Sequence, residues 1–205
     1  MKKVLSIIGA MLLTMSLNAQ TTLKILPFSI DPGETKVVTL DLDNYDFEAA
    51  SFKCDIVLPE GLEIEKNARG KYNLSFNAEA DRTSLEYHSL SSQVQQDGSV
   101  RIVCYSASAD VFMGNSGAIL NVPIVASSTV SGKGEVQVTN QEVTDATGMI
   151  AVKPATYSAE VTMGPTGIEE VNGEGSLADG KYVKNGQIVI KKGDKEYTTV
   201  GTISK

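Results

Sequence analysis

Alternating apolar and polar residues dominate the chain, and a period of two is typical of β-strands. Between Val38 and Asp43 every apolar residue is followed by Thr or Asp. No stretch of helical length carries an apolar stripe with the 3.6-residue period. The pattern therefore predicts an all-β fold, a nine-stranded β-sandwich or jelly roll in which two sheets each bury one face. The strands are expected near residues 23–30, 35–43, 50–58, 72–76, 84–95, 99–106, 117–125, 134–140 and 155–163.

The turn at Asp97-Gly98 allows two strand registers. A two-residue turn would place Val94 opposite Arg101, whereas a three-residue loop pairs Val94 with Val100 and requires Gly98 to adopt the left-handed conformation. A slip of one residue turns every side chain to the other face of the sheet. The correct register is therefore the one that places apolar residues opposite apolar residues. We predict the three-residue loop, which pairs Leu90 with Cys104, directs Val100, Ile102 and Cys104 inward, and directs Arg101, Val103 and Tyr105 outward.

Residues 1–19 have the features of a secretory signal peptide. Lys2 and Lys3 precede a short apolar stretch, and Ala19 supplies the small residue of a cleavage site. The alternative is a membrane anchor, but the stretch is shorter than the roughly 20 residues that span a bilayer, and no later segment comes close. The mature chain is expected to begin at Gln20, to lack a transmembrane segment, and to be extracellular or on the cell surface.

The chain changes character after the predicted sandwich, residues 20–163. Residues 164–178 are rich in glycine and acidic residues and are interpreted as a linker. Residues 179–205 contain two turn signals, Asn185-Gly186 and Gly193-Asp194, between strand-like runs. A small C-terminal β-meander is therefore expected, serving as a sorting or attachment element.

Composition narrows the possible partners. Without Lys2 and Lys3 the chain has 16 basic residues against 25 acidic ones, a net charge of about −9. No basic run is available for a phosphate backbone, so nucleic acid is not an expected partner. A hydrophobic content of 41% suffices for a packed core.

His88 is the only histidine, and the chain has no tryptophan. A Ser-His-Asp triad would need His88, yet no G-x-S-x-G motif is present. His88 shares its parity with the inward-facing Leu90, so we interpret it as a sheet-edge histidine bonded to a neighbour. No catalytic residue is identified, and the protein is not expected to be an enzyme.

Two further groups of residues suggest bridges or metals. Cys54 and Cys104 both have inward parity. Two thiols and a single histidine are too few ligands for a structural zinc site. The two cysteines therefore form either a disulfide or two buried thiols. The run Asp41 to Asp46 resembles the start of a calcium loop. Its sixth position is Asp46 and its twelfth Phe52, where such a loop needs glycine and glutamate. We expect a solvated strand end there, and neither metal nor cofactor.

Four runs carry a family resemblance: residues 35–43, 49–62, 100–106 and 114–120. Together they resemble cohesin-type modules, nine-stranded jelly rolls related in fold to bacterial carbohydrate-binding modules, over residues 22 to 163. The resemblance implies a binding module in extracellular polysaccharide degradation. The C-terminal pattern from Gly180 to Ile190 is similar to C-terminal segments of secreted Bacteroidetes proteins, although it is shorter than a full sorting domain.

Three functions remain open. The first is protein binding of cohesin type, with an extracellular dockerin-like partner. The second is glycan binding, although the absence of tryptophan leaves only scattered tyrosines such as Tyr87 and Tyr105 as a platform. The third is a structural surface protein.

The resemblance also implies where binding occurs. In cohesin-like modules the partner binds the sheet that holds the third, fifth and sixth strands, and the third and sixth are neighbours, which would bring Cys54 and Cys104 onto adjacent antiparallel strands. Tyr105 and Arg101 are of residue types enriched among energetic hot spots. The loops at 43–48 and 110–115 are the alternative location. Parity selects for the outer face Lys53, Asp55, Val57, Ser89, Ser91, Gln93, Arg101, Val103 and Tyr105.

Overall fold

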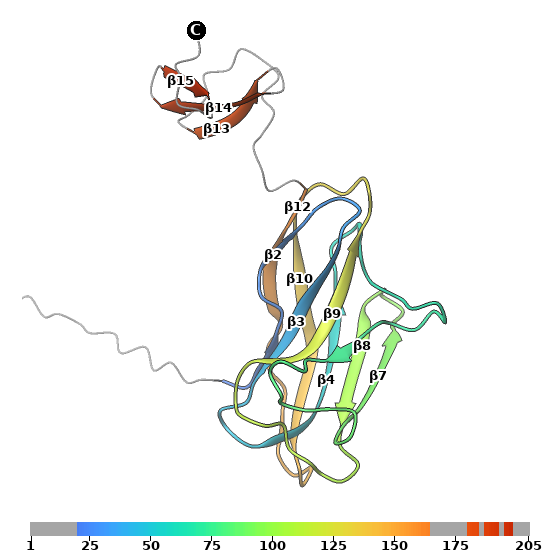
Figure 1. The fold of residues 1–205 in the computed structure, drawn as a ribbon. Helices are drawn as coiled ribbons and strands as arrows, with labels where there is room; N and C mark the ends of the chain where they lie inside the picture. The colour runs from blue at the N-terminus through green and yellow to red at the C-terminus, as the bar shows by residue number, and fades with distance from the viewer. Residues whose placement is uncertain (1–19, 165–179, 185–186, 193–194, 199–205) are drawn as a thin grey trace, which may run out of the picture.

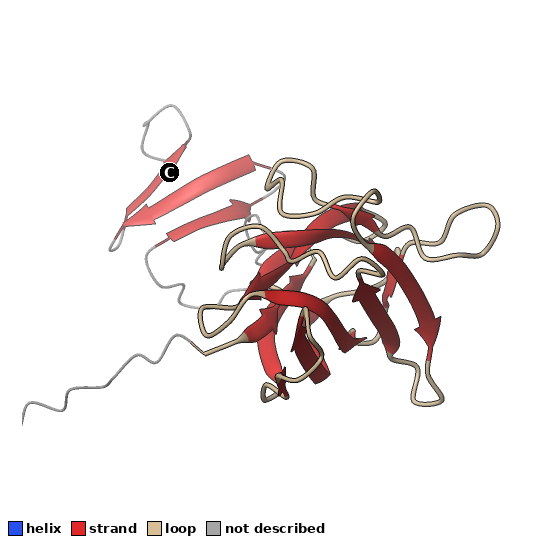
Figure 2. Ribbon diagram, turned by 90° about the horizontal axis from the view of Figure 1, so that it is seen from below, coloured by secondary structure: helices blue, strands red, loops and turns tan. Residues whose placement is uncertain are grey.

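The computed structural model describes residues 20–164, 180–184, 187–192 and 195–198. Residues 20–164 form two β-sheets packed face to face, and no helix occurs in the described part of the chain (Figures 1 and 2). The predicted β-sandwich is therefore confirmed.

The shorter sheet has the order β1-β3-β9-β5, and β6 also pairs with β9. Its pairings are antiparallel. Figure 1 shows β3 and β9 lying in front of the longer sheet. The strands are β1 (Thr22–Lys24), β3 (Thr35–Asp43), β5 (Leu62–Ile64), β6 (Ser75–Phe76) and β9 (Ala118–Ala126).

The longer sheet has the order β2-β12-β10-β4-β8-β7, and β11 pairs with β10. All of its pairings are antiparallel except that between β2 and β12. Strand β7 therefore forms one edge. The strands are β2 (Phe28–Ile30), β4 (Ala49–Val57), β7 (Ser89–Val94), β8 (Val100–Tyr105), β10 (Gly132–Asp145), β11 (Ala151–Val152) and β12 (Tyr157–Met163).

The core lies between the two sheets. Period-two alternation turns one apolar set of each strand inward, and these side chains are almost completely shielded from water. Burial of this apolar area is the main source of stability. Typical members are Leu40, Leu42, Leu120, Val122 and Ile124 from the shorter sheet, and Phe52, Ile56, Ile102, Val136 and Val138 from the longer one.

Two predicted strands need correction, and one observed strand was missed. The expected strand 23–30 is two strands in different sheets, because Pro27 lacks a backbone N–H and interrupts the ladder between β1 and β2. Strand β5 was not predicted, since three residues are too few for a clear alternation. The expected strand 84–95 begins only at Ser89, and a backbone hydrogen bond from His88 to Ser84 closes a turn before it.

The hairpin between β7 and β8 has the predicted register. Val94 lies opposite Val100 and Leu90 opposite Cys104. Gly98 has a φ of 85°, which glycine adopts without steric cost. The assignment of inward and outward side chains on β8 is confirmed as well, since its burial alternates from Val100 onward.

The C-terminal strands also follow the predicted pattern. Strands β13 (Gly180–Lys184), β14 (Gln187–Lys192) and β15 (Lys195–Thr198) pair antiparallel in sequence order, as a meander does. The predicted signal peptide, residues 1–19, lies outside the described residues, as does the linker after Gly164. No helix among the described residues has the length and apolar character that a membrane crossing requires.

Candidate functional site

All nine residues predicted for binding lie on the outer face of strands β4, β8 and β7. The register aligns them in rows across the sheet: one row joins Lys53, Val103 and Ser91, and the next joins Asp55, Arg101 and Gln93. Tyr105 lies opposite Ser89 in a third row, and Val57 extends the β4 side. This shared face, called the outer β4-β8-β7 face below, follows from parity within each strand and the strand order.

Asp55 differs from the other eight residues because it is buried, with 1% of its surface exposed. Its two carboxylate oxygens accept hydrogen bonds from Nε and Nη2 of Arg101, each at 2.7 Å. The Arg101 hydrogen bond is the main reason why the pKa of Asp55 lies below its usual value, and burial opposes this shift. Asp55 is therefore an anchor beneath the face, and Arg101 is the group that covers it.

A bulge in β10 supplies a further donor to Asp55. The pairing with β4 shifts between Thr139 and Glu142, and Asn140 adopts a φ of 47°, a left-handed conformation in which asparagine is enriched. Its side-chain amide donates to Oδ2 of Asp55 at 2.7 Å. The next residue, Gln141, is buried and accepts from the backbone N–H of Leu23 at 2.7 Å. The bulge thus serves both faces of the sheet.

The remaining part of the face combines apolar and charged groups. Tyr105 is 47% exposed, and Val103 is partly buried beside it in the next row. Lys53 donates to Glu142 at 2.8 Å across the neighbouring strand pair. Aromatic residues are enriched in recognition surfaces whereas lysine and glutamate are depleted there, so Tyr105 rather than the ion pair favours a binding role for this face.

Cys54 and Cys104 lie on the adjacent antiparallel strands β4 and β8, and both are completely buried, as predicted. Both thiols are free, so the candidate disulfide is absent. Cys54 lies opposite Ile102, and Cys104 lies opposite Phe52. The cysteines are therefore diagonal neighbours, whose separation of about 7–8 Å exceeds the roughly 4.4–6.8 Å between Cα atoms of a disulfide.

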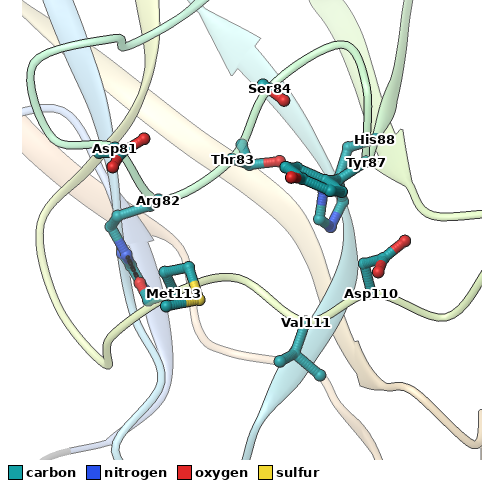
Figure 3. A pocket seen from close by; sticks show the side chains of 9 residues that line it. All are labelled: Asp81, Arg82, Thr83, Ser84, Tyr87, His88, Asp110, Val111 and Met113. Atoms are coloured by element: carbon teal, nitrogen blue, oxygen red, sulfur yellow. Dashed lines mark hydrogen bonds between the residues drawn. The ribbon is translucent and has the colours of Figure 1, made fainter.

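His88 lines a pocket of ≈ 420 Å³ at one end of the sandwich (Figure 3). A hydrogen bond joins its Nδ1 to Thr83 Oγ1, and its ring stacks on Phe112 with 4.4 Å between centroids. Burial lowers the pKa of His88. Figure 3 shows Tyr87 beside the two bonded side chains and Asp110 on the far side of the histidine ring.

This pocket lacks the arrangement of a triad. Among the described residues no carboxylate is hydrogen-bonded to His88, and the Asp110 carboxylate instead accepts from Ser106 and Ser108. An oriented acid is what holds the base of a triad in place. His88 lies just before the edge strand, bonded through Nδ1 and stacked on Phe112, while its Nε2 has no hydrogen-bond partner among the described residues.

Arg82 is the residue in this pocket that sequence reasoning missed. It is 4% exposed and makes five hydrogen bonds, four of them to backbone carbonyls and one to Asn44 Oδ1. Burial lowers its pKa, while Asp43 and Asp41 oppose this effect. No local sequence signal marks such a residue, because the carbonyls come from distant segments, at Leu42, Met113, Gly114 and Gly117.

The run from Asp41 to Asp46 is a strand end followed by a turn. Asp43 pairs with Lys24, and Asn44 donates to the Phe47 carbonyl at 3.1 Å. Asp46 accepts from the backbone and the hydroxyl of Thr21. Among the described residues no group of three or more His, Cys, Asp or Glu side chains could hold a metal ion.

Neither the family models nor the curated proteins give a match to this chain. Solved structures do, and those described here are cohesin modules. The non-cellulosomal cohesin of Archaeoglobus fulgidus has a TM-score of 0.54 at 18% identity, covering 71% of this chain and 91% of that one. The seventh ScaB type I cohesin of Pseudobacteroides cellulosolvens has a TM-score of 0.55 at 16% identity, covering 75% and 98%.

A third similar structure is a type I cohesin–dockerin complex from Clostridium thermocellum. Its TM-score is 0.53 at 14% identity, with 70% of this chain and 98% of the other covered. At such identities the comparison shows the fold. The chain has the fold of a cohesin-type module, which confirms the resemblance seen in its sequence.

Proposed function

We propose that this protein is an exported, non-catalytic binding module of cohesin type that holds a protein partner on its outer β4-β8-β7 face. The observation that carries the proposal is the arrangement of that face, where Val103 lies in the row next to the fixed Asp55–Arg101 pair and the exposed Tyr105 lies in the row beyond it. A cohesin-type module in complex with a dockerin has the same fold, which supports a protein as the partner.

The ion pair prepares the surface for binding. Arg101 is held by two hydrogen bonds, so its side chain loses little further freedom when a partner covers it. Tyr105 adds apolar area with a polar tip and only two side-chain torsions. A dockerin-like protein in the setting of extracellular polysaccharide degradation is the partner we infer.

Export through a cleaved signal peptide is part of this proposal. Ala19 and the short apolar stretch before it fit a signal peptidase site. The intact mass of the protein recovered outside the producing cell should correspond to a chain that begins at Gln20. Retention of residues 1–19 would refute the export step but would leave the binding face untouched.

The binding step is tested by affinity capture from the secretome of the producing cell, with a glycan array run in parallel. Once a partner is identified, Tyr105→Ala should weaken its binding by about 2 kcal/mol, roughly thirtyfold. Tyr45→Ala is the matched control, since Tyr45 is 48% exposed but lies on a loop at the end of the sandwich.

Three results would contradict the proposal. A partner that binds both variants equally well would move the site away from this face. Loss of binding only in the Tyr45→Ala variant would assign it to the loops at 43–48 and 110–115. Glycan binding without any protein partner would favour a carbohydrate-binding module.

A further inference from the structure

Strand β7 is an open edge of the longer sheet. Among the described residues its only strand partner is β8, and its other side pairs with no strand. The Gln95 N–H donates to the Ser99 carbonyl, so alternate residues of β7 from Ser89 to Gln93 bond to β8. The backbone N–H and C=O groups of the residues in between, Leu90, Ser92 and Val94, therefore point away from the sheet.

A groove runs along this edge. It has a volume of ≈ 510 Å³ and lies between residues 90–94 of β7 and a segment that contributes Lys66, Lys71, Tyr72 and Leu74. Leu74 and Leu90 pack partly against the core and form an apolar floor. Val94 is 54% exposed at one end of the edge. The groove thus offers backbone hydrogen-bonding groups on one wall and apolar surface beneath.

The other wall is positively charged. Lys66 and Tyr72 form a β-bridge, and the tight turn between them carries Arg69 and Lys71. The Lys66 ammonium lies 5.1 Å from the centroid of the Tyr72 ring. In the described part of the chain neither Lys66 nor Lys71, the two cations that line the groove, forms an ion pair, and no carboxylate lines the groove. Two lysines without an anionic partner are unusual in a chain whose net charge is strongly negative.

We propose that this groove binds an extended acidic peptide that adds to the longer sheet as a strand next to β7. Backbone hydrogen bonds would run to Leu90, Ser92 and Val94, as in other cases of strand addition to a free edge. Alternate side chains of the peptide would face the floor at Leu74, and its carboxylates would reach Lys66 and Lys71. The groove shares Ser91 and Gln93 with the outer β4-β8-β7 face but includes neither Tyr105 nor Arg101, so it does not depend on the proposed function.

A second copy of the chain is a poorer occupant. Residues Ser89–Val94 contain no charged side chain, so a neighbouring β7 would leave the lysines of both copies without anionic partners. Two cationic turns would also approach each other across the new strand pair, which like charges disfavour. Charge complementarity therefore favours a peptide rich in Asp and Glu.

The test uses the full chain and a fluorescent eight-residue peptide in which Glu alternates with Val or Thr. Lys66→Glu combined with Lys71→Glu should weaken binding at least tenfold, because the cationic wall becomes anionic. The matched control combines Lys133→Glu with Lys153→Glu on β10 and next to β11, away from the groove. It changes the net charge equally and should alter affinity less than twofold.

Two further measurements address the backbone. Ser92→Pro removes one outward N–H at an edge position, where proline is tolerated, and should also weaken binding at least tenfold. Its circular dichroism spectrum and unfolding temperature verify that the sandwich still forms. In the unchanged protein the peptide should slow hydrogen exchange at Leu90, Ser92 and Val94.

Several outcomes would overturn the proposal. These are equal binding of a Gln-for-Glu peptide, equal binding of a peptide N-methylated at alternate amides, or exchange protection in β4 and β8 without protection of Leu90, Ser92 and Val94. Dimerisation that protects the same three amides without peptide would assign the edge to a second copy. Tyr105→Ala should leave peptide binding unchanged, so failure here and failure of the proposed function can be told apart.

Discussion

Two arginines at opposite parts of the sandwich hold very different partners. Arg82 is buried and donates to four backbone carbonyls and an asparagine oxygen, so its bonds organise loops. Arg101 keeps 36% of its side chain exposed and pairs with one carboxylate. The comparison shows that one residue type can hold buried loops together in one place and bind a buried carboxylate from a partly exposed position in another. The two arginines differ in the exposure of the side chain and in the acceptor, which is mainly backbone carbonyls for Arg82 and a carboxylate for Arg101.

The largest effect is expected when Arg82 is replaced. Arg82→Met removes five hydrogen bonds and leaves buried carbonyls without donors, so the free energy of unfolding should fall by about 3 kcal/mol or more. For a chain of this size that corresponds to roughly 6–12 °C in unfolding temperature. Thermal unfolding monitored by circular dichroism measures it. Arg69→Met, at an exposed turn, is the control and should shift stability by at most about 0.5 kcal/mol.

A smaller effect is expected on the other side of the comparison. Asp55→Asn keeps the shape of the side chain but removes its charge, and at neutral pH it should cost about 1–2 kcal/mol because hydrogen bonds to a charged acceptor are lost. Urea unfolding at pH 7 provides the value. If Arg82→Met proves less harmful than Asp55→Asn, the division into an organising and a surface arginine is wrong.

The pH dependence sharpens this second prediction. The pKa of Asp55 is lowered in the folded state, so its stabilising contribution is present above the unfolded pKa of about 3.9 and is lost as the pH falls through the folded value. The stability gap between the original chain and Asp55→Asn should therefore close between about pH 4 and the folded pKa. A stability difference between the two proteins that stays constant as the pH falls to the folded pKa of Asp55 would contradict the assigned role of the Arg101 hydrogen bonds.

The smallest effect concerns the inner face of β4 and β8. Both thiols are free, so a reductant should leave the unfolding temperature unchanged. Burial raises the pKa of Cys104 to about 12, and a thiol reagent should react with it at least about a hundredfold more slowly at pH 8 than with the unfolded chain. If reduction lowers the unfolding temperature, a disulfide between Cys54 and Cys104 is present and the argument from the strand register is wrong.

Sequence patterns predicted the features that depend on local periodicity. Gly98 and the pairing of Val94 with Val100 set one hairpin register, and parity then placed nine side chains on one face. The resemblance supplied the neighbouring positions of β4 and β8. These features were accessible because alternation and turn chemistry act within a few residues.

The features that escaped prediction depend on distant or irregular structure. Asp55 was expected at the surface but is buried beneath Arg101, and Asn140 also reaches it from a bulge that interrupts the alternation. The bonds of Arg82 join residues 31 to 40 positions away. Pro27 interrupts residues 23–30, and the sheet that each half joins then depends on the strands available as partners. None of these can be read from a period of two.

The hydrogen bonds of Arg82 also bear on how long the folded state persists. Because the acceptors are 31 to 40 residues away, these bonds can form only after the segments around β3 and β9 have come together. Interactions that form after the folding transition state slow unfolding and leave the rate of folding nearly unchanged. We therefore expect Arg82 to lengthen the lifetime of the folded protein mainly by slowing unfolding, so that Arg82→Met raises the unfolding rate more than it lowers the folding rate.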